Sequence, residues 1–141
     1  MKIPKPKKQK TLAKVKKDVW TVFSEYVRKR DCLRTTGCTS WGFCITCGKR
    51  LHIKLLQAGH FIAGRHNANL FSERGVHAQC YNCNINLKGN TLEYRRKIIE
   101  LYGEGADLEL EAEERETKKF TISELEEFKR DLKERIRKLD D

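Results

Sequence analysis

The chain has 141 residues, of which 38% are hydrophobic and 35% are charged, and its formal net charge is +10. This length accommodates one domain with extensions, and the low apolar content predicts a small core. No apolar run approaches the length of a membrane span, and the basic start Met-Lys-Ile-Pro lacks the apolar segment of a secretory signal. These features argue against a membrane protein and against a secreted disulfide scaffold. We therefore expect a cytoplasmic protein whose six cysteines stay reduced.

The positive charge is concentrated in the first two thirds of the chain. Residues 1–90 carry 18 Lys and Arg against 4 Asp and Glu, a net of +14, whereas residues 91–141 carry 12 against 16, a net of −4. Such an excess indicates a polyanionic partner, and nucleic acid is the first candidate. The alternative is that the lysines only confer solubility.

The first twelve residues contain two prolines and five lysines, which predicts a basic, disordered arm. From residue 13 onward, apolar side chains recur at three- and four-residue steps and predict an amphipathic helix. Its stripe comprises Val15, Val19, Val22, Phe23, Tyr26 and Val27. The basic residues around the ends of this helix are expected to face DNA, and they are Lys14, Lys16, Lys17, Arg28, Lys29 and Arg30.

Two Cys-x-x-Cys pairs, Cys44/Cys47 and Cys80/Cys83, have the spacing of a four-thiolate zinc site. Residues 31–43 read as a loop with a short strand, and residues 55–62 and 76–79 are expected to pair as a hairpin between the two cysteine pairs. Four thiolates fill a tetrahedral site, so this zinc is expected to be structural. Hydrolysis would need a second ion such as Mg²⁺ or Mn²⁺.

The C-terminal third is expected to be helical with one polar interruption. A helix after Cys83 is interrupted at residues 88–90, resumes with Thr91 as its N-cap and stops at Gly103. Residues 104–119 read as an acidic linker or a solvated helix. Thr121 then caps an amphipathic helix whose stripe comprises Ile122, Leu125, Phe128, Leu132, Ile136 and Leu139. This stripe is expected to pack on the first helix, and a homodimer seam is the alternative.

Several strings between residues 13 and 102 are similar to the NinG (Rap) family of phage recombination endonucleases. They run from Phe23 to Thr36, from Gln57 to Arg65, from Val76 to Cys80 and from Leu87 to Asn90. More broadly, the cysteine pairs, Gly59-His60-Phe61 and the Asn84 that follows the last cysteine resemble the His-Asn-His (HNH, ββα-metal) nuclease superfamily. They also resemble a phage junction-resolving endonuclease with four zinc cysteines.

The resemblance implies an α+β fold with a small zinc-stapled ββα-metal (HNH-type) core and flanking N- and C-terminal helices. It divides the chain into a basic arm (1–12), a nuclease domain (13–103) and an acidic linker with a terminal helix (104–141). The implied activity is cleavage of branched DNA, such as Holliday junctions or D-loops, by a phage protein in its bacterial host, with other recombination proteins as possible partners.

The resemblance also assigns roles to individual residues. His60 would act as the general base and Asn84 as a ligand of a catalytic Mg²⁺ or Mn²⁺, while Arg65 and Lys88 would contact DNA phosphates. Many of these nucleases have Asp immediately before the histidine as a second metal ligand, and that position is Gly59 in this chain. The candidates for the missing ligand are Gln57, His77 and Glu73. Of the first two, His77 is preferred because an imidazole binds transition metals better than a neutral amide does.

Two other functions remain open from the sequence. The chain could be a zinc-ribbon module that binds nucleic acid without cleaving it. It could also be an interaction protein that recruits a partner through its terminal helix.

Overall fold

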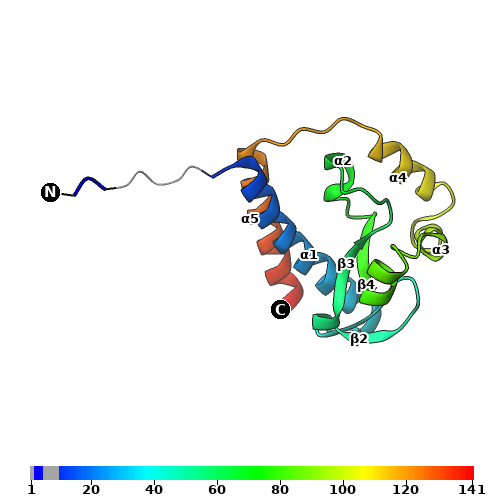
Figure 1. Cartoon of the computed structure of the whole chain (residues 1–141). Coiled ribbons are helices and arrows are strands. Elements are labelled where there is room, and N and C mark those ends of the chain that lie inside the picture. Colours follow the sequence, from blue (N-terminus) through cyan, green and yellow to red (C-terminus); the bar gives the residue numbers. More distant parts are fainter. Residues whose placement is uncertain (1, 5–9) are drawn as a thin grey trace.

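The computed structural model describes residues 2–4 and 10–141 and shows a mixed α+β fold with two small antiparallel sheets (Figure 1). Half of the predicted basic arm, residues 1 and 5–9, lies outside the described residues. In chain order the elements are α1 (Leu12–Thr36), β1 (Trp41–Phe43), β2 (Arg50–His52), η1 (Ile53–Leu55), β3 (Leu56–His60), α2 (Asn67–Leu70), β4 (Val76–Cys80), η2 (Asn82–Asn86), α3 (Thr91–Tyr102), α4 (Ala106–Glu114) and α5 (Ile122–Asp140).

The predicted first helix is confirmed, but it is longer than the sequence pattern indicated. Thr11 caps α1 by accepting a hydrogen bond from the Lys14 backbone N–H at 3.2 Å. The helix runs through Asp31, which the pattern assigned to a loop, and ends at Gly37, whose φ of +79° suits a helix stop. Asp31 is buried and its Oδ2 accepts the Ala78 backbone N–H at 2.8 Å. This tertiary contact ties the last turns of α1 to β4.

The hairpin predicted between the cysteine pairs is also confirmed. Strand β3 pairs antiparallel with β4, so that Gln57 lies opposite Gln79 and Gly59 lies opposite His77. Alternate residues of a strand point to opposite faces. Accordingly Ala58 and Val76 join the α1 core, whereas the opposite face carries Gln79 and His77.

The C-terminal helix packs within the chain. Leu125 and Leu132 of α5 share one buried cluster with Val19, Phe23 and Val27 of α1, and Figure 1 shows the two helices side by side. The plainer of the two expectations for this stripe is therefore confirmed, as is the Thr121 cap, which accepts from the Glu124 backbone N–H at 3.1 Å. A homodimer through α5 stays a prediction.

The acidic stretch is less solvated than expected. Its helix α4 buries Ala106 and Leu110 against Phe61, Tyr94 and Ile98, so it closes a second cluster on the far side of the β3–β4 hairpin. Figure 1 shows α3 and α4 on the side of the hairpin away from α1 and α5. One cap also differs: α3 is preceded by Asn90 in the left-handed region, not by Thr91, although it ends before Gly103 as predicted.

Among the residues that the structure describes, no helix combines the length and apolar character needed to cross a lipid bilayer.

Candidate active site

The four paired cysteines converge at one point. The sulfur atoms of Cys44, Cys47, Cys80 and Cys83 all lie within 4.8 Å of one another, and those of Cys47 and Cys80 are 3.7 Å apart. Thiolates about 2.3 Å from a tetrahedral zinc ion are separated by about 3.8 Å. The cluster could therefore hold a zinc ion, and with four sulfur ligands that ion would have no open position.

Local turns direct the sulfur atoms inward. Gly48, with a φ of +75°, turns the first knuckle and donates its N–H to the Cys44 carbonyl at 2.9 Å. In the second knuckle the Cys83 N–H points at the Cys80 sulfur, at 3.3 Å. Because Cys80 ends β4 and Cys83 lies in η2, the cluster fixes η2 against the hairpin.

A cleft of about 570 Å³ lies along β3, between α1 and η2. Both residues expected to carry catalysis line it: His60 at the end of β3, and Asn84 in η2. Three of the predicted DNA contacts, Arg28, Arg65 and Lys88, line it as well. The four cysteines thus hold together the two segments that bring His60 and Asn84 to one cavity.

The ring of His60 is oriented by two groups that the sequence did not reveal. Its Nε2 lies 3.0 Å from the Leu70 carbonyl oxygen. A carbonyl only accepts, so Nε2 carries the proton and Nδ1 holds the lone pair of the neutral ring. The ring also stacks on Trp20 of α1, with centroids 5.1 Å apart and planes 15° apart. Burial lowers the pKa of His60, the positive charge of Arg65 lowers it further, and the Leu70 hydrogen bond opposes both. The lowered pKa favours the neutral form of the His60 ring.

Amide side chains gather beside Asn84. The Nδ2 of Asn84 donates to Gln57 Oε1 at 2.8 Å. Gln79 is fully buried and its Nε2 donates to the Gly89 carbonyl at 2.9 Å and to Thr46 Oγ1 at 3.2 Å. Its Oε1 has no hydrogen-bond donor among the described residues. This oxygen lies against Gly59, where the side chain of a superfamily aspartate would begin.

Replacing Gly59 with Asp is consequently expected to destabilise the fold instead of restoring a metal ligand. A Cβ at position 59 would lie 1.9 Å from Gln79 Oε1 and 2.8 Å from Gln79 Cδ. Gln79 can retreat only by giving up its two hydrogen bonds, so we expect a loss of about 1–3 kcal/mol in the free energy of unfolding for Gly59→Ala and Gly59→Asp alike. Urea unfolding of the zinc-loaded proteins measures this.

A double-mutant cycle with Gln79→Ala supplies the control for that steric explanation. Once the Gln79 side chain is gone, adding a side chain at position 59 should cost much less, so the two effects will not add. Full stability of Gly59→Ala, or simple additivity in the cycle, would contradict the clash.

Of the candidates for the missing metal ligand, only Gln57 lies at the cleft. His77 shares a face of the hairpin with Gln79 but is buried in a hydrogen-bond chain with two tyrosines, with Nε2 2.7 Å from the Tyr102 hydroxyl and Nδ1 3.3 Å from the Tyr94 hydroxyl. Tyr94 in turn donates to the Gly59 carbonyl at 2.6 Å. The Glu73 carboxylate pairs with Arg135 of α5. The structure therefore does not bring His77 or Glu73 to Asn84.

The buried His77 predicts acid sensitivity of the fold. Burial lowers its pKa to about 4, against an ordinary value of 6.5. The unfolded chain then binds more protons than the native protein between these two values, so stability falls as the pH drops from about 6.5 to about 4. The difference corresponds to about 3 kcal/mol. We expect His77→Gln to show a correspondingly shallower loss than the original protein in urea unfolding across this range.

Acid release of zinc affects both proteins in that comparison, so the informative quantity is the difference between the two curves. His52→Gln, at a histidine that is only half-buried, should follow the original curve. Parallel curves for the original protein and His77→Gln would contradict a buried neutral His77.

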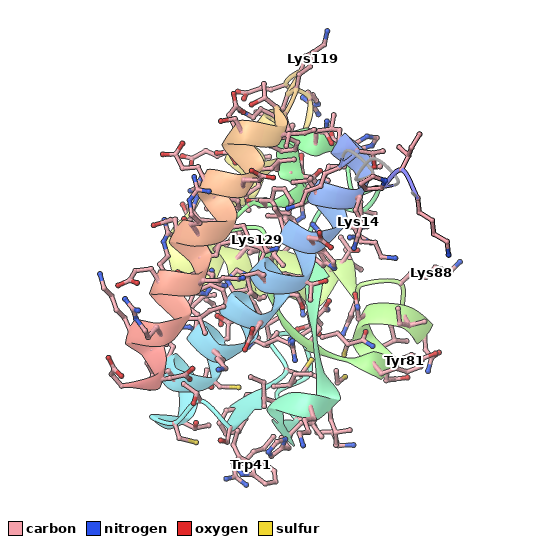
Figure 2. All side chains as sticks on the ribbon, turned by 90° about the vertical axis from the view of Figure 1, so that its left-hand side faces the viewer. Lys14, Trp41, Tyr81, Lys88, Lys119 and Lys129 are labelled. Atoms are coloured by element: carbon pink, nitrogen blue, oxygen red, sulfur yellow. The ribbon has the colours of Figure 1, made fainter. Side chains whose placement is uncertain are left out.

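The other predicted DNA contacts do not line the cleft, and they differ in whether they lie near it or are engaged within the protein. Lys16 and Lys17 lie beside Trp20 and Arg65 and extend the basic surface from the cleft along α1. Lys14, labelled on the upper part of α1 in Figure 2, pairs with Asp18 at 2.8 Å. By contrast, Lys29 pairs with Glu25 and Asp140. The predicted role of Arg30 is not favoured either, because its guanidinium binds Asp31 and the backbone carbonyls of Glu73 and Val76.

Comparison with known proteins assigns the chain to a family. The family model described as "Bacteriophage Lambda NinG protein" matches residues 2–141. Protein ninG of Salmonella phage P22 is 32% identical over 99 residues, which cover 70% of this chain and 48% of that protein. Protein ninG of Escherichia phage 933W is 31% identical over 97 residues, or 68% of this chain and 47% of that protein.

The chain therefore spans about half the length of these relatives. No solved structure matches it. The chain belongs to the NinG family of bacteriophage proteins.

Proposed function

We propose that this protein is a metal-dependent DNA endonuclease with an HNH-type (ββα-metal) site, and that branched recombination intermediates are its substrates. The observation that carries the proposal is the shared cleft. His60 lies on the α1 face of β3, with Nε2 at the Leu70 carbonyl and the Nδ1 lone pair free, and Asn84 bonds Gln57 on the opposite face of that strand. Both side chains line this one cavity. The zinc at the four cysteines would be structural. The preference for branched DNA rests on the family resemblance.

The side-chain oxygens at Asn84 and Gln57 are of the type that a hard divalent ion binds, but they carry no negative charge. Amide oxygens are acceptable ligands for Mg²⁺ or Mn²⁺, whereas the residues that line the cleft include no carboxylate. Substrate phosphates would have to provide the negative charge. Such an ion would then bind weakly without DNA, with Asn84 as its main protein ligand and Gln57 beside it.

The residues of the cleft would have different roles in phosphodiester hydrolysis. His60, held by Leu70 and Trp20, accepts a proton from the attacking water at Nδ1. Arg65, Arg28 and Lys88 hold the phosphates that flank the scissile bond by charge-assisted hydrogen bonds. A divalent ion bound at Asn84 would supply charge neutralisation at the phosphate and stabilisation of the leaving oxygen.

Cleavage of synthetic DNA tests the proposal. The zinc-loaded protein is incubated with a four-way junction and with a linear duplex of the same arm sequence, with Mn²⁺ and without added divalent ion. We expect cleavage of the junction only when Mn²⁺ is present, and little or none of the duplex. A protein that binds the junction and cleaves neither DNA under any of these conditions would overturn the enzymatic function.

The second candidate function is a zinc module that binds DNA without cleaving it. This function predicts that the protein binds the junction but cleaves neither DNA. The observation that favours it is the lack of a carboxylate among the cleft-lining residues. The two functions share the basic cleft and differ only in cleavage, so the same assay separates them.

A further inference from the structure

The outer face of the β1–β2 hairpin carries an exposed cluster that the cleft does not use. Trp41 lies opposite His52, and Phe43 lies opposite Arg50. Gly42, between the two aromatic residues, faces inward against Cys32 and Leu56. Since neighbouring residues of a strand alternate in direction, Trp41, Phe43, Arg50 and His52 share the outward face. We call these four residues the hairpin patch.

The aromatic rings of the hairpin patch are open to solvent. Trp41 and Phe43 are each 38% exposed, and Figure 2 shows Trp41 projecting from the end of the molecule opposite Lys119. The Arg50 guanidinium lies 4.5 Å from the centre of the Trp41 ring, and the His52 ring meets Trp41 edge-on at 5.3 Å. These two contacts hold the indole in place while leaving part of its surface free.

The chain segment that carries the hairpin patch is basic, and the acidic Glu100 of α3 lies only on its Phe43 side. Residues 32–72 contain no Asp or Glu, and Lys49, Arg50 and Lys54 are exposed within this stretch. Across residues 2–4 and 10–141, none of these three side chains takes part in an ion pair. An open aromatic platform among unpaired cations complements a chain that offers phosphates and flat rings together, which is an unpaired nucleic-acid strand.

The hairpin patch also borders the cleft. Arg28 and Leu56 line the cleft at the end where η1 joins β3. Arg28 contacts the Ile53 carbonyl at 3.4 Å, and Ile53 follows His52 of the hairpin patch. Lys54 and Leu55 of η1 are exposed between the two sites. Segment η1 therefore connects the cleft to the hairpin patch.

We propose that the hairpin patch is a second nucleic-acid contact, where Trp41 stacks on an unpaired base and Arg50 and Lys54 bind the adjoining phosphates. This proposal rests on DNA being the substrate of the proposed function. It adds a physical basis for a preference for branched DNA that contains an unpaired strand, such as a D-loop, because a continuous duplex offers no unstacked base.

Binding without cleavage tests this contact. Fluorescence anisotropy is measured with a labelled oligothymidylate and with a labelled duplex of equal length, at one salt concentration and without Mg²⁺ or Mn²⁺. Stacking on one base contributes about 1–3 kcal/mol, so Trp41→Ala should weaken binding of the unpaired strand about 5- to 100-fold and leave duplex affinity nearly unchanged. Trp41→Phe should retain most of the affinity. Arg50→Ala should weaken binding of both DNAs.

The matched control is Leu108→Ala, which removes an exposed apolar side chain from α4 and should bind as the original protein does. Zinc content and circular dichroism establish that each variant is folded. Unchanged binding of the unpaired strand by folded Trp41→Ala, or an equal loss on both DNAs, would overturn stacking at the hairpin patch while leaving the cleavage site intact. If the original protein bound neither DNA, the proposed function would fail together with this contact.

Discussion

A Cys80→Ser variant is expected to lose zinc and, with it, the fold of the segment between the two knuckles. The sulfur atoms of the cluster hold η2 against the end of β4, and the apolar clusters around them are small. Structural zinc contributes about 10–16 kcal/mol of apparent binding free energy, which is mostly folding free energy in a small domain. A serine hydroxyl is a poor substitute for a thiolate, so most of that contribution disappears.

Zinc stoichiometry and circular dichroism measure this outcome together. The variant should contain far less than one zinc ion per chain and should lose cooperative unfolding. The helices α1 and α5 share a separate apolar cluster and could keep part of the helical signal. The control is Cys38→Ser, because Cys38 is exposed and lies outside the cluster. A Cys80→Ser protein that retained a full zinc ion and the original unfolding curve would contradict a structural role for the cluster.

His60→Ala is expected to bind branched DNA normally and to cleave it at a rate reduced about 10²- to 10⁴-fold, the contribution of a positioned general base. The effect should fall on the single-turnover rate, since the phosphate contacts proposed for Arg28, Arg65 and Lys88 would remain. Single-turnover cleavage under Mn²⁺, with binding measured separately, gives both quantities.

The pH dependence of the proposed cleavage by the original protein would give an independent test of the same residue. Burial lowers the pKa of His60. The basic form therefore persists below pH 6.5, and the acidic fall in cleavage rate should come below that value. The control His66→Ala removes an exposed histidine outside the cleft lining and should leave rate and profile unchanged. Full activity of folded His60→Ala would exclude His60 as the base.

The features set by local spacing could be predicted from the sequence. Two Cys-x-x-Cys pairs predict a four-cysteine cluster whatever lies between them, and the segments 55–62 and 76–79 predicted the β3–β4 hairpin. Because Thr121 supplies a local cap and α5 has a regular stripe, that helix was equally predictable. The assignment of His60 and Asn84 to one cleft followed from the knuckles that hold their segments.

Features that depend on tertiary contacts could not be predicted in this way. The continuation of α1 to Thr36 depends on Asp31 reaching the backbone of β4. The partners of His60 are an indole from α1 and a backbone carbonyl from α2, and neither has a sequence signature. His77 is a plausible ligand by residue type and spacing, but two tyrosines from α3 occupy its ring nitrogens. The contact between Gly59 and the Gln79 side chain likewise depends on the pairing of β3 with β4, which the sequence does not specify in register.

The position of Mn²⁺ in a crystal of the zinc-loaded protein with a non-cleavable branched DNA tests the proposed site most directly. The account predicts an anomalous manganese peak in the cleft, bound by the side-chain oxygen of Asn84 and a DNA phosphate, with the His60 ring facing the same phosphate. DNA that occupies the cleft without manganese, or manganese bound only at surface carboxylates, would contradict it.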